Sequence, residues 1–336
     1  MATNRKITLA ARPVGFPKET DFNLSEEPVP VPGPGEMLVR VVYLSLDPYM
    51  RGMMSDRKSY ARPIQLGEVM VGGTVGKVVQ SNHPDYVKGD IVLGNMGWQE
   101  YAISDGTGLR KIDPQVAPIS TALGVLGMPG LTAYFGLLDI TNPKPGETVV
   151  ISGAAGAVGT VAGQIAKLKG CRVIGIAGSD AKINYLVGEL GFDAAFNYRS
   201  VENYYEVLHE ICPEGIDVYF DNVGGSITDA VFRLVNPRAR ISVCGQISLY
   251  NLEKPDFGPR LLPHLLINQA RAEGFLVFQF ADRYAEGLSE LTHWLRNGKL
   301  KYREDIVEGI GNAPRAFIAM LQGRNMGKQL VKLSVP

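Results

Sequence analysis

Three glycines stand at regular spacing near the middle of the chain, where they could bind a phosphate. Gly153, Gly156 and Gly159 follow the short apolar segment 148–151 and precede a run with apolar residues at helical spacing. A glycine turn between a strand and a helix lets the backbone approach a pyrophosphate at the helix N-terminus. The spacing is a variant of the usual dinucleotide-binding pattern, but the flanking segments are those of a βαβ unit. A glycine-rich turn of some other α/β protein is the alternative interpretation.

The end of the second strand of this unit indicates which dinucleotide binds. NAD sites usually carry Asp or Glu there, on the ribose 2′-hydroxyl, whereas this chain reads Ala177-Gly178-Ser179. Lys182 follows in the next predicted helix, where its ammonium group could bind a 2′-phosphate. Asp180 is expected at the N-terminus of that helix, as a cap or a partner of the helix dipole. The sequence therefore favours NADP, and a solvated surface lysine is the alternative for Lys182.

Two of the 14 tyrosines follow predicted strands and could donate a hydrogen bond to a substrate oxygen. Tyr49 comes shortly after one such strand, and Tyr250 lies in the loop after another. A phenol with a pKa near ~10 is neutral at pH 7 and can donate to an oxygen on which negative charge develops. From position alone, a packing role is equally compatible with either side chain. Arg51 is expected to form an ion pair with Asp47 or to bind the backbone.

The composition of the chain excludes several classes of protein. The 336 residues carry 34 basic and 34 acidic side chains, so nothing indicates a nucleic-acid partner. The uncharged stretches 114–138 and 148–166 are interrupted by prolines or glycines, so neither is expected to span a membrane. Cys171, Cys212 and Cys244 are an odd number without close spacing, which argues against disulfides and favours a cytoplasmic location.

The sequence offers no metal site. A structural zinc needs four closely spaced ligands, and the three cysteines and four histidines are scattered along the chain. We therefore predict no bound metal, so another group must stabilise charge that develops on a substrate oxygen.

Two kinds of sequence pattern predict the α/β fold that positions these residues. Residues 7–112 contain short strands, such as 37–46 and 69–79, separated by glycine and proline turns, which is typical of a partly closed β-barrel. From the glycine turn onward, strands and helices alternate, which predicts a doubly wound parallel sheet. Its strands are predicted at 148–151, 171–177, 194–196, 216–221, 240–244 and 274–279, and the helices after the second strand at 181–189, 201–211, 226–234, 261–271 and 283–297.

The end of the chain is predicted to return to the first domain. A helix is expected at 313–321 and a strand at 329–333. A helical segment at 122–140, around Pro129, is expected to join the two domains. The predicted domains are 1–125, completed by 300–336, for the barrel, and 126–299 for the nucleotide-binding sheet.

Several longer motifs make the chain similar to a known family. They are 46–51 (LDPYMR), 127–137, 153–170, 220–225 (FDNVGG), 244–251 (CGQISLYN) and 325–328 (NMGK). With them the chain resembles the leukotriene B4 12-hydroxydehydrogenase/prostaglandin reductase group of zinc-independent medium-chain dehydrogenases/reductases, which includes alkenal/one and curcumin reductases. The resemblance implies a GroES-like β-barrel domain and a Rossmann domain, usually as a homodimer. It also implies NADPH-dependent reduction of the C=C bond of α,β-unsaturated aldehydes and ketones, with hydride to the β-carbon and an enolate stabilised by a tyrosine.

The resemblance also assigns roles to individual residues. Tyr49 and Tyr250 become the catalytic residues. Cys244 is expected to be a wall residue and not a nucleophile, because no histidine lies near it in the sequence. Phe278 and Phe280 are expected in the core. NADPH or NADP+ is expected to contact Gly156, Ala157, Val158, Gly159, Lys182, Tyr198, Asn222, Cys244, Gly245, Gln246, Ile247, Ser248, Tyr250, Phe275, Leu276, Val277 and Asn325.

Two other functions stay open on the sequence alone. An NADPH quinone oxidoreductase of the same superfamily would share the zinc-free barrel and the cofactor site. A relative that binds nucleotide or RNA without catalysis would share the glycine turn, but the balanced charge of the chain disfavours RNA.

Overall fold

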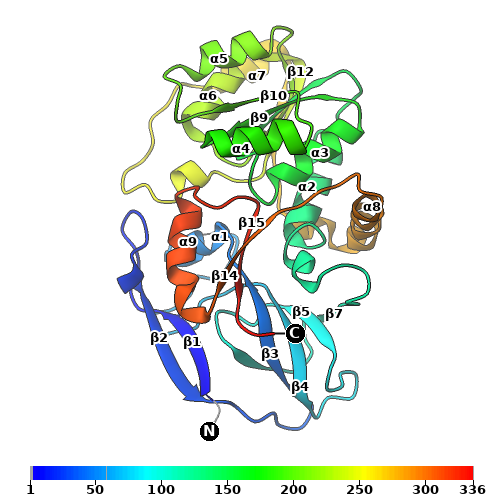
Figure 1. Cartoon of the computed structure of the whole chain (residues 1–336). Coiled ribbons are helices and arrows are strands. Elements are labelled where there is room, and N and C mark those ends of the chain that lie inside the picture. The colour runs from blue at the N-terminus through cyan, green and yellow to red at the C-terminus, as the bar shows by residue number, and fades with distance from the viewer. Residues whose placement is uncertain (1–2, 58, 336) are drawn as a thin grey trace. The chain divides into compact units, whose positions relative to one another are not determined.

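The structure is a computed structural model that describes residues 3–57 and 59–335 (Figure 1). The chain forms two compact units, each with its own core. Unit 1 comprises Met1–Leu123 and Glu304–Pro336, and unit 2 comprises Gly124–Arg303. The boundaries that we predicted, after residues 125 and 299, differ from these by a few residues. No helix among the described residues is long and apolar enough to cross a membrane.

Unit 2 is built on one parallel sheet of six strands. The strand order is β10-β9-β8-β11-β12-β13, and every neighbouring pair is parallel. All five residues of the central strand β8 are buried, as expected for a strand covered on both faces. The strands are β8 (Thr148–Ser152), β9 (Arg172–Ala177), β10 (Ala194–Asn197), β11 (Ile216–Asp221), β12 (Val235–Val243) and β13 (Arg271–Gly274). The predicted doubly wound sheet is confirmed.

Helices cover both faces of this sheet (Figure 1). Apolar residues of α5, α6 and α7 join strand residues in one core cluster, which places these helices on one face. The helices α3 and α4 contact β8, β9 and β10 from the other face. The helices are α2 (Met128–Leu138), α3 (Gly159–Leu168), α4 (Asp180–Asn184), α5 (Tyr204–Ile211), α6 (Gly225–Phe232), α7 (Leu262–Asn268) and α8 (Tyr284–Arg296). A π-helical turn, η3 (Tyr185–Glu189), continues α4.

The last strand of unit 2 corrects the sequence prediction. The strand expected at 274–279 is wrong, because β13 ends at Gly274 and Val277–Arg283 form a 3-10 helix, η5. Two of the apolar residues that suggested a strand, Phe275 and Val277, are buried, and the Phe275 ring meets the Phe220 ring edge-on at 6.4 Å. The Gln279 side chain then accepts a hydrogen bond from the N–H of Leu276 at 2.7 Å, which starts η5. The real strand is polar and escaped detection because it lies at an exposed edge.

Two further predictions in unit 2 need correction. The helix expected at 122–140 is two elements, the 3-10 helix η2 (Ile119–Leu123) and α2, and Pro129 stands in the first turn of α2. Proline is favoured there because its missing N–H has no partner in any helix. Phe278 is 55% exposed and not in the core, whereas Phe280 stacks on Phe135 with ring centroids 4.7 Å apart.

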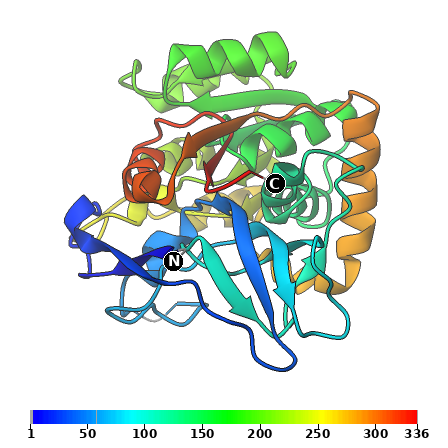
Figure 2. The ribbon, with the colours of Figure 1, turned by 60° about the horizontal axis from the view of Figure 1, so that its bottom comes forward.

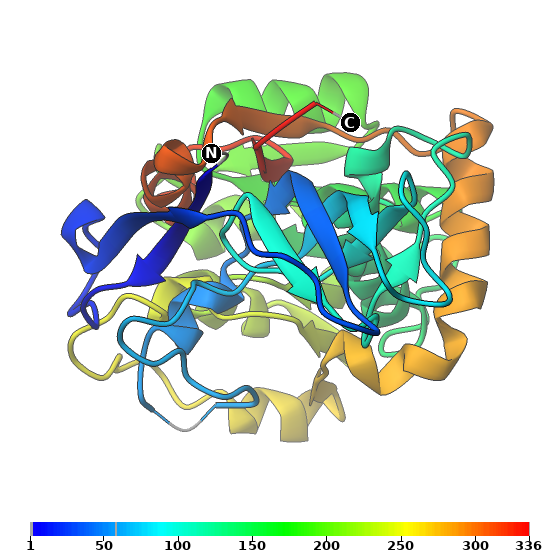
Figure 3. The ribbon, with the colours of Figure 1, turned by 90° about the horizontal axis from the view of Figure 1, so that it is seen from below.

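Unit 1 is a β structure that both ends of the chain complete. Its larger sheet has the order β14-β15-β3-β4-β5-β7, and β6 pairs with β3 (Figure 2). The pair β1–β2 is antiparallel and forms a separate two-stranded sheet, dark blue in Figure 3. The strands are β1 (Thr3–Leu9), β2 (Phe22–Pro28), β3 (Met37–Ser45), β4 (Thr74–Ser81), β5 (Ile91–Gly94), β6 (Tyr101–Ser104), β7 (Arg110–Lys111), β14 (Glu304–Glu308) and β15 (Lys328–Lys332). These sheets fit the GroES-like fold predicted for this part of the chain.

The short helices of unit 1 pack on these strands. The α9 helix (Ala313–Leu321) has the predicted bounds, and its Phe317 ring meets the Trp98 ring edge-on at 5.6 Å. Trp98 also stacks on Phe22 at 5.7 Å, which ties α9 to β2. The helix α1 (Tyr49–Met53) follows β3 directly. Three 3-10 turns complete the elements, namely η1 (Glu19–Asp21), η4 (Ile247–Leu249) in unit 2, and η6 (Ile310–Asn312).

Candidate active site

The glycine turn between β8 and α3 has the shape that a dinucleotide phosphate requires. Gly153 has φ +60°, which favours glycine. A Cβ at Gly159 would lie 2.5 Å from the carbonyl oxygen of Gly153, so the first turn of α3 packs against the turn only because this residue has no side chain. The predicted residues from Gly156 to Gly159 therefore lie in a tight turn at the N-terminus of a ten-residue helix, which is where a phosphate would bind.

The carboxyl end of β9 carries the residues expected at a 2′-phosphate. Ser179 caps α4, because its hydroxyl accepts from the N–H of Lys182 at 3.4 Å. Lys182 is only 9% exposed, so the alternative of a solvated surface lysine is wrong. A Cβ at Gly178 would lie 2.9 Å from the hydroxyl of Tyr198, which places that ring directly beside the glycine. A buried lysine and the Tyr198 phenol therefore both belong to the segments around the end of β9.

No carboxylate of this region takes the position of a ribose acid. Asp180 is the first residue of α4 and accepts a hydrogen bond from the Asn197 amide at 2.9 Å. Its negative charge interacts favourably with the helix dipole at the N-terminus of α4, as predicted, but the capping residue is Ser179. Sequence reasoning missed Arg199, whose guanidinium lies 5.6 Å from the centre of the Tyr198 ring. Its position directly after Tyr198 was the available signal.

At the carboxyl end of β11, Asp221 accepts hydrogen bonds from several surrounding groups. Nothing in the sequence indicated this role. This aspartate is 1% exposed, and its carboxylate accepts hydrogen bonds from neighbouring side chains and backbone. The hydroxyl of Ser152 at the end of β8 donates to it at 3.0 Å. The predicted cofactor residue Asn222 binds the same serine, donating from its backbone N–H to the Ser152 hydroxyl at 2.9 Å and from its side chain to the Ser152 carbonyl at 2.7 Å. The ends of β8 and β11 are therefore fixed to each other.

The loop after β12 carries Tyr250 and most of the predicted nicotinamide contacts. The N–H groups of Cys244 and Gly245 donate to the carbonyl of Asp221 at 2.9 and 3.0 Å. The Tyr250 hydroxyl accepts from the N–H of Gln246 at 3.2 Å, which leaves its own O–H to donate elsewhere. Burial raises the pKa of Tyr250, so the phenol stays protonated at neutral pH.

Cys244, predicted as a wall residue and not a nucleophile, has a thiol that burial keeps protonated. Burial, followed by the nearby Asp221 carboxylate, raises the pKa of the Cys244 thiol to about 12. A neutral thiol is a poor nucleophile. The adjoining segment after β13 is also largely packed, since Phe275 and Val277 are buried.

Tyr49 stands in unit 1 as the first residue of α1. Burial first, and the Asp47 carboxylate second, raise the pKa of Tyr49, so this phenol is also protonated at neutral pH. Asp47 forms a buried ion pair with Lys328, whose Nζ lies 2.6 Å from the carboxylate. Lys328 also donates to the carbonyl of Leu46 at 2.9 Å, and the Ser45 hydroxyl donates to Asp47. A lysine of β15 therefore anchors the junction between β3 and α1.

Of the two roles predicted for Arg51, an ion pair with Asp47 or binding to the backbone, the structure has the second. Lys328 takes the carboxylate, and the Arg51 guanidinium donates to the carbonyls of Pro13 and Gly15 at 3.3 and 2.9 Å. Asn325, expected at the nicotinamide, donates to the carbonyl of Gly327 at 2.9 Å in the turn before β15.

The predicted cofactor residues of unit 2 share one edge of its sheet. Gly153 follows β8, Lys182 follows β9, Tyr198 follows β10, Asn222 follows β11 and Cys244 follows β12. The segment 275–277 follows β13. Ligands of open α/β sheets bind at the carboxyl ends of the strands, so the arrangement fits a dinucleotide. Tyr49 and Asn325 belong to unit 1.

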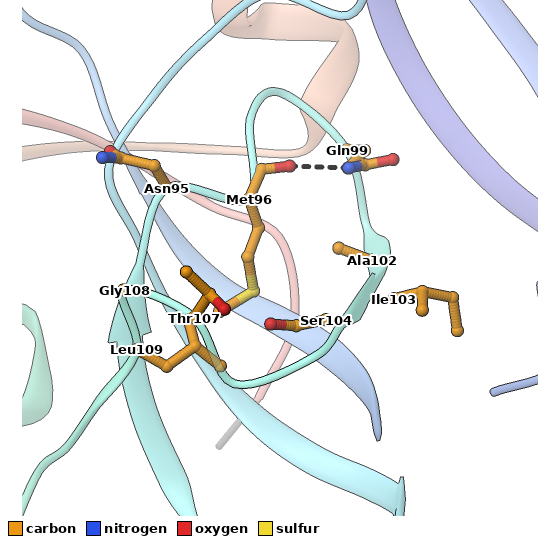
Figure 4. Close-up of a pocket in the computed structure, with 9 residues that line it drawn as sticks. All are labelled: Asn95, Met96, Gln99, Ala102, Ile103, Ser104, Thr107, Gly108 and Leu109. Carbon is orange, nitrogen blue, oxygen red and sulfur yellow. Dashed lines mark hydrogen bonds between the residues drawn. The ribbon is translucent and has the colours of Figure 1, made fainter. Parts of the chain in front are cut away.

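A cavity elsewhere in unit 1 has no chemistry of its own. Its volume is about 310 Å³, and Met96, Ser104 and Leu109 are among the residues that line it (Figure 4). The nine lining residues include no acid, base or thiol and none of the predicted site residues. The Gln99 amide is turned back onto the carbonyl of Met96 at 2.6 Å. Among the described residues, no three His, Cys, Asp or Glu side chains are grouped to hold a metal.

Comparison with known proteins identifies the family. A family described as the N-terminal domain of oxidoreductase matches residues 5–112, and one described as zinc-binding dehydrogenase matches 157–293. The NADPH-dependent curcumin reductase of Escherichia coli (strain K12) is 49% identical and covers 98% of this chain and 97% of its own length. Prostaglandin reductase 1 of Rattus norvegicus is 46% identical over 99% of this chain and 100% of its own. The chain belongs to the medium-chain dehydrogenase/reductase family.

Within this family the chain falls in the alkenal and prostaglandin reductase group, as its motifs indicated. The crystal structure of CurA in complex with NADPH from Vibrio vulnificus matches with a TM-score of 0.95 and 50% identity, over 99% of this chain and 100% of that one. The chain is accordingly an NADP-dependent oxidoreductase with NADPH as its cofactor. The bare glycine turn and the buried Lys182 fit that cofactor.

Proposed function

We propose that this enzyme reduces the C=C bond of α,β-unsaturated aldehydes and ketones, with a tyrosine, Tyr250 or Tyr49, as the donor to the substrate carbonyl. NADPH would supply the hydride, which adds to the β-carbon as the C=C π bond breaks; negative charge then develops on the carbonyl oxygen, and a proton added to the α-carbon gives the saturated product. The observation that carries the proposal is the Tyr250 phenol, protonated and held by a backbone N–H at the carboxyl edge of the nucleotide-binding sheet. The relatives named for curcumin and prostaglandin reduction support the same class of substrate.

The setting of Tyr250 suits a hydrogen-bond donor. Its oxygen accepts from the N–H of Gln246, and a hydroxyl that accepts one hydrogen bond donates a stronger one. Burial keeps the proton on the phenol. A fixed donor aimed at an oxygen that becomes an enolate stabilises the transition state more than the ground state.

Tyr49 is the candidate donor of unit 1. The buried pair of Asp47 and Lys328 fixes the start of α1, and the raised pKa of Tyr49 keeps its proton in place. In this proposal a tyrosine donor replaces the Lewis acid of zinc-dependent relatives.

The cofactor would lie along the carboxyl edge of the unit 2 sheet. The backbone from Gly156 to Gly159 would hold the pyrophosphate, and Lys182 with Tyr198 would hold the 2′-phosphate. The nicotinamide half would meet the loop 244–250, the segment 275–277 and Asn325. These placements rest on the family pattern together with the strand ends described above.

The test is the loss of NADPH absorbance with an aliphatic enone beside a simple quinone, followed by product analysis. We expect a saturated ketone, formed with NADPH and far more slowly with NADH. Turnover of the quinone with no reduction of the enone would replace the proposal with a quinone oxidoreductase. Binding of NADPH without turnover of either compound would leave only a nucleotide-binding protein.

We also infer that two copies of the chain associate through the β13 edge of unit 2. All four residues of β13 are exposed, and the strand is last in the sheet order. An exposed strand edge can pair with the same edge of a second copy. On α7, which packs on β12, three apolar side chains are 75–80% exposed, namely Leu262, Leu266 and Ile267. Light scattering on Leu266→Asp should show monomers if this surface is the interface.

The location and the range of partners are inferred from weaker features. Three free cysteines, two of them buried, suit the reducing cytoplasm. Equal numbers of basic and acidic residues give no reason to expect a nucleic-acid partner.

A further inference from the structure

Asp221 is a buried carboxylate that neutral groups stabilise. It is 1% exposed, and none of the ion pairs recorded among the described residues includes it. Six donors point at its two oxygens, at 2.7–3.0 Å. They are the hydroxyls of Ser152, Tyr219 and Thr228, the N–H groups of Val223 and Gly224, and the amide of Gln246.

This carboxylate is fixed against the segment proposed to meet the nicotinamide. The Gln246 amide donates to it at 2.7 Å, while the N–H of the same residue donates to the Tyr250 hydroxyl. A Cβ at Gly224 would clash with the Gln246 side chain, so the two loops touch with no room between them. The Ser248 hydroxyl adds a bond to the carbonyl of Val223 at 2.6 Å. Asp221 is therefore held close beneath the loop 244–250.

Hydrogen bonds from neutral donors do not cancel a charge. The six dipoles make burial of the carboxylate tolerable, but its unit negative charge stays in a region of low dielectric, where it is weakly screened. The nicotinamide ring is neutral in NADPH and positively charged in NADP+. A fixed negative charge near the ring therefore stabilises the oxidised cofactor more than the reduced one.

We propose that Asp221 is a positioning residue that also biases the site toward NADP+ relative to NADPH. The proposal rests on the proposed function, because it places the nicotinamide half of the cofactor at the loop 244–250. With that placement, the uncancelled charge makes hydride loss from bound NADPH more favourable. The same bonds hold Gln246, and through it Tyr250, in one position. Reaction driving force and donor geometry thus depend on one side chain.

The test measures the two cofactors separately, without turnover. Dissociation constants for NADP+ and for NADPH are determined by calorimetry for the intact enzyme and for Asp221→Asn. The amide keeps the size of the carboxylate, and the Gln246 side chain can turn to accept from it. We expect the ratio of the NADP+ constant to the NADPH constant to rise on the order of tenfold. An unchanged ratio, with both constants shifted alike, would overturn the proposal.

A carboxylate on the same strand provides the matched control. Asp217 lies near the start of β11, where it accepts from the N–H of Thr148 at 2.9 Å and from the Asn236 amide at 2.8 Å. Asp217→Asn removes a charge from the strand without touching its carboxyl end. The ratio of the two constants should stay as in the intact enzyme. A rise equal to that of Asp221→Asn would also overturn the proposal, because position would then not matter.

A second variant keeps the test decisive if Asp221→Asn does not fold. Tyr219→Phe removes one neutral donor from the carboxylate and leaves its charge less compensated. The ratio of the NADP+ dissociation constant to the NADPH dissociation constant should then stay unchanged or fall, whereas loss of the charge in Asp221→Asn should raise it. A rise after Tyr219→Phe would contradict the proposal. Enone turnover is measured separately on the intact enzyme, so failure of the proposed reaction is distinguished from failure of the charge effect.

Discussion

The two proposed catalytic tyrosines lie beside two buried aspartates that are stabilised in different ways. In unit 1, Asp47 precedes Tyr49 by two residues and pairs with the Lys328 ammonium at 2.6 Å. In unit 2, Asp221 lies under the Tyr250 loop and is held by neutral donors alone among the described contacts. The charge beside Tyr49 is therefore cancelled, and the charge near Tyr250 is not.

This difference separates structural anchoring from electrostatic tuning. A buried ion pair tolerates no loss of one partner, because the other charge is then stranded, yet it adds little net field at a distance. A carboxylate solvated by dipoles can lose single donors at moderate cost and keeps its field. Disruption of the first aspartate should therefore appear mainly in stability, and disruption of the second mainly in cofactor affinity and rate.

The largest expected effect is on stability, from Lys328→Met. The substitution leaves Asp47 buried without its cation, which should lower the free energy of unfolding by about 3–5 kcal/mol. Urea titration followed by circular dichroism measures the loss. The double variant Asp47→Asn with Lys328→Met should recover most of it, because no unpaired charge is left. A single variant as stable as the parent would show that the pair does not anchor α1.

The next effect is on turnover, from Tyr250→Phe. Loss of one donor to a developing oxyanion costs about 10²–10³-fold in kcat, with little change in NADPH affinity. Tyr49→Phe should also slow enone reduction, and the variant with the larger loss identifies the tyrosine that contributes more. Tyr134→Phe is the matched control, since that hydroxyl binds Glu286 away from the strand ends. Normal kcat in both active-site variants would refute the tyrosine mechanism.

Local patterns in the sequence predicted several elements of the fold, but they did not predict the buried pair of Asp47 and Lys328. The strand Ile216–Asp221 and the helix Ala313–Leu321 have their predicted bounds, because apolar spacing and flanking glycines or prolines are local signals. The glycine turn between β8 and α3 was predicted from the same kind of local signal. Lys328 and Asp47 are separated by 281 positions in the sequence, so no local pattern joins them. For Arg51, which is nearer to Asp47 in the sequence, the prediction left open an ion pair with Asp47 or binding to the backbone, and the structure has the second.

The remaining differences between prediction and structure concern residues whose burial, or whose place at the edge of a sheet, depends on the fold. Asp221 reads as the polar end of a strand, and only the fold shows that six donors converge on it. The edge strand Arg271–Gly274 is too polar to resemble a strand, whereas the buried apolar residues after it do resemble one. The burial of Lys182 likewise depends on the packing of α4 and not on its neighbours in the sequence.

A smaller effect is expected on cofactor choice, from Lys182→Ala. Charge-assisted hydrogen bonds are worth about 1.5–3 kcal/mol, so NADPH affinity should fall roughly 10- to 100-fold while NADH affinity changes little. Lys167→Ala is the control, because that ammonium pairs with Asp193 at 2.7 Å instead. Fluorescence titration with each cofactor gives the constants. An equal loss for NADPH and NADH would remove Lys182 from the phosphate site.

The smallest expected effect is the change of kcat with pH. The protonated phenols are the active forms, and burial raises the pKa of Tyr49 and of Tyr250 above the ordinary value of about 10. A raised pKa moves the loss of the proton to higher pH, so kcat should stay level from neutral pH to about pH 10. Single-turnover rates with saturating NADPH and enone measure this limb. A decline centred about two pH units lower that persists in Tyr250→Phe would show that a group other than the Tyr250 phenol loses its proton first.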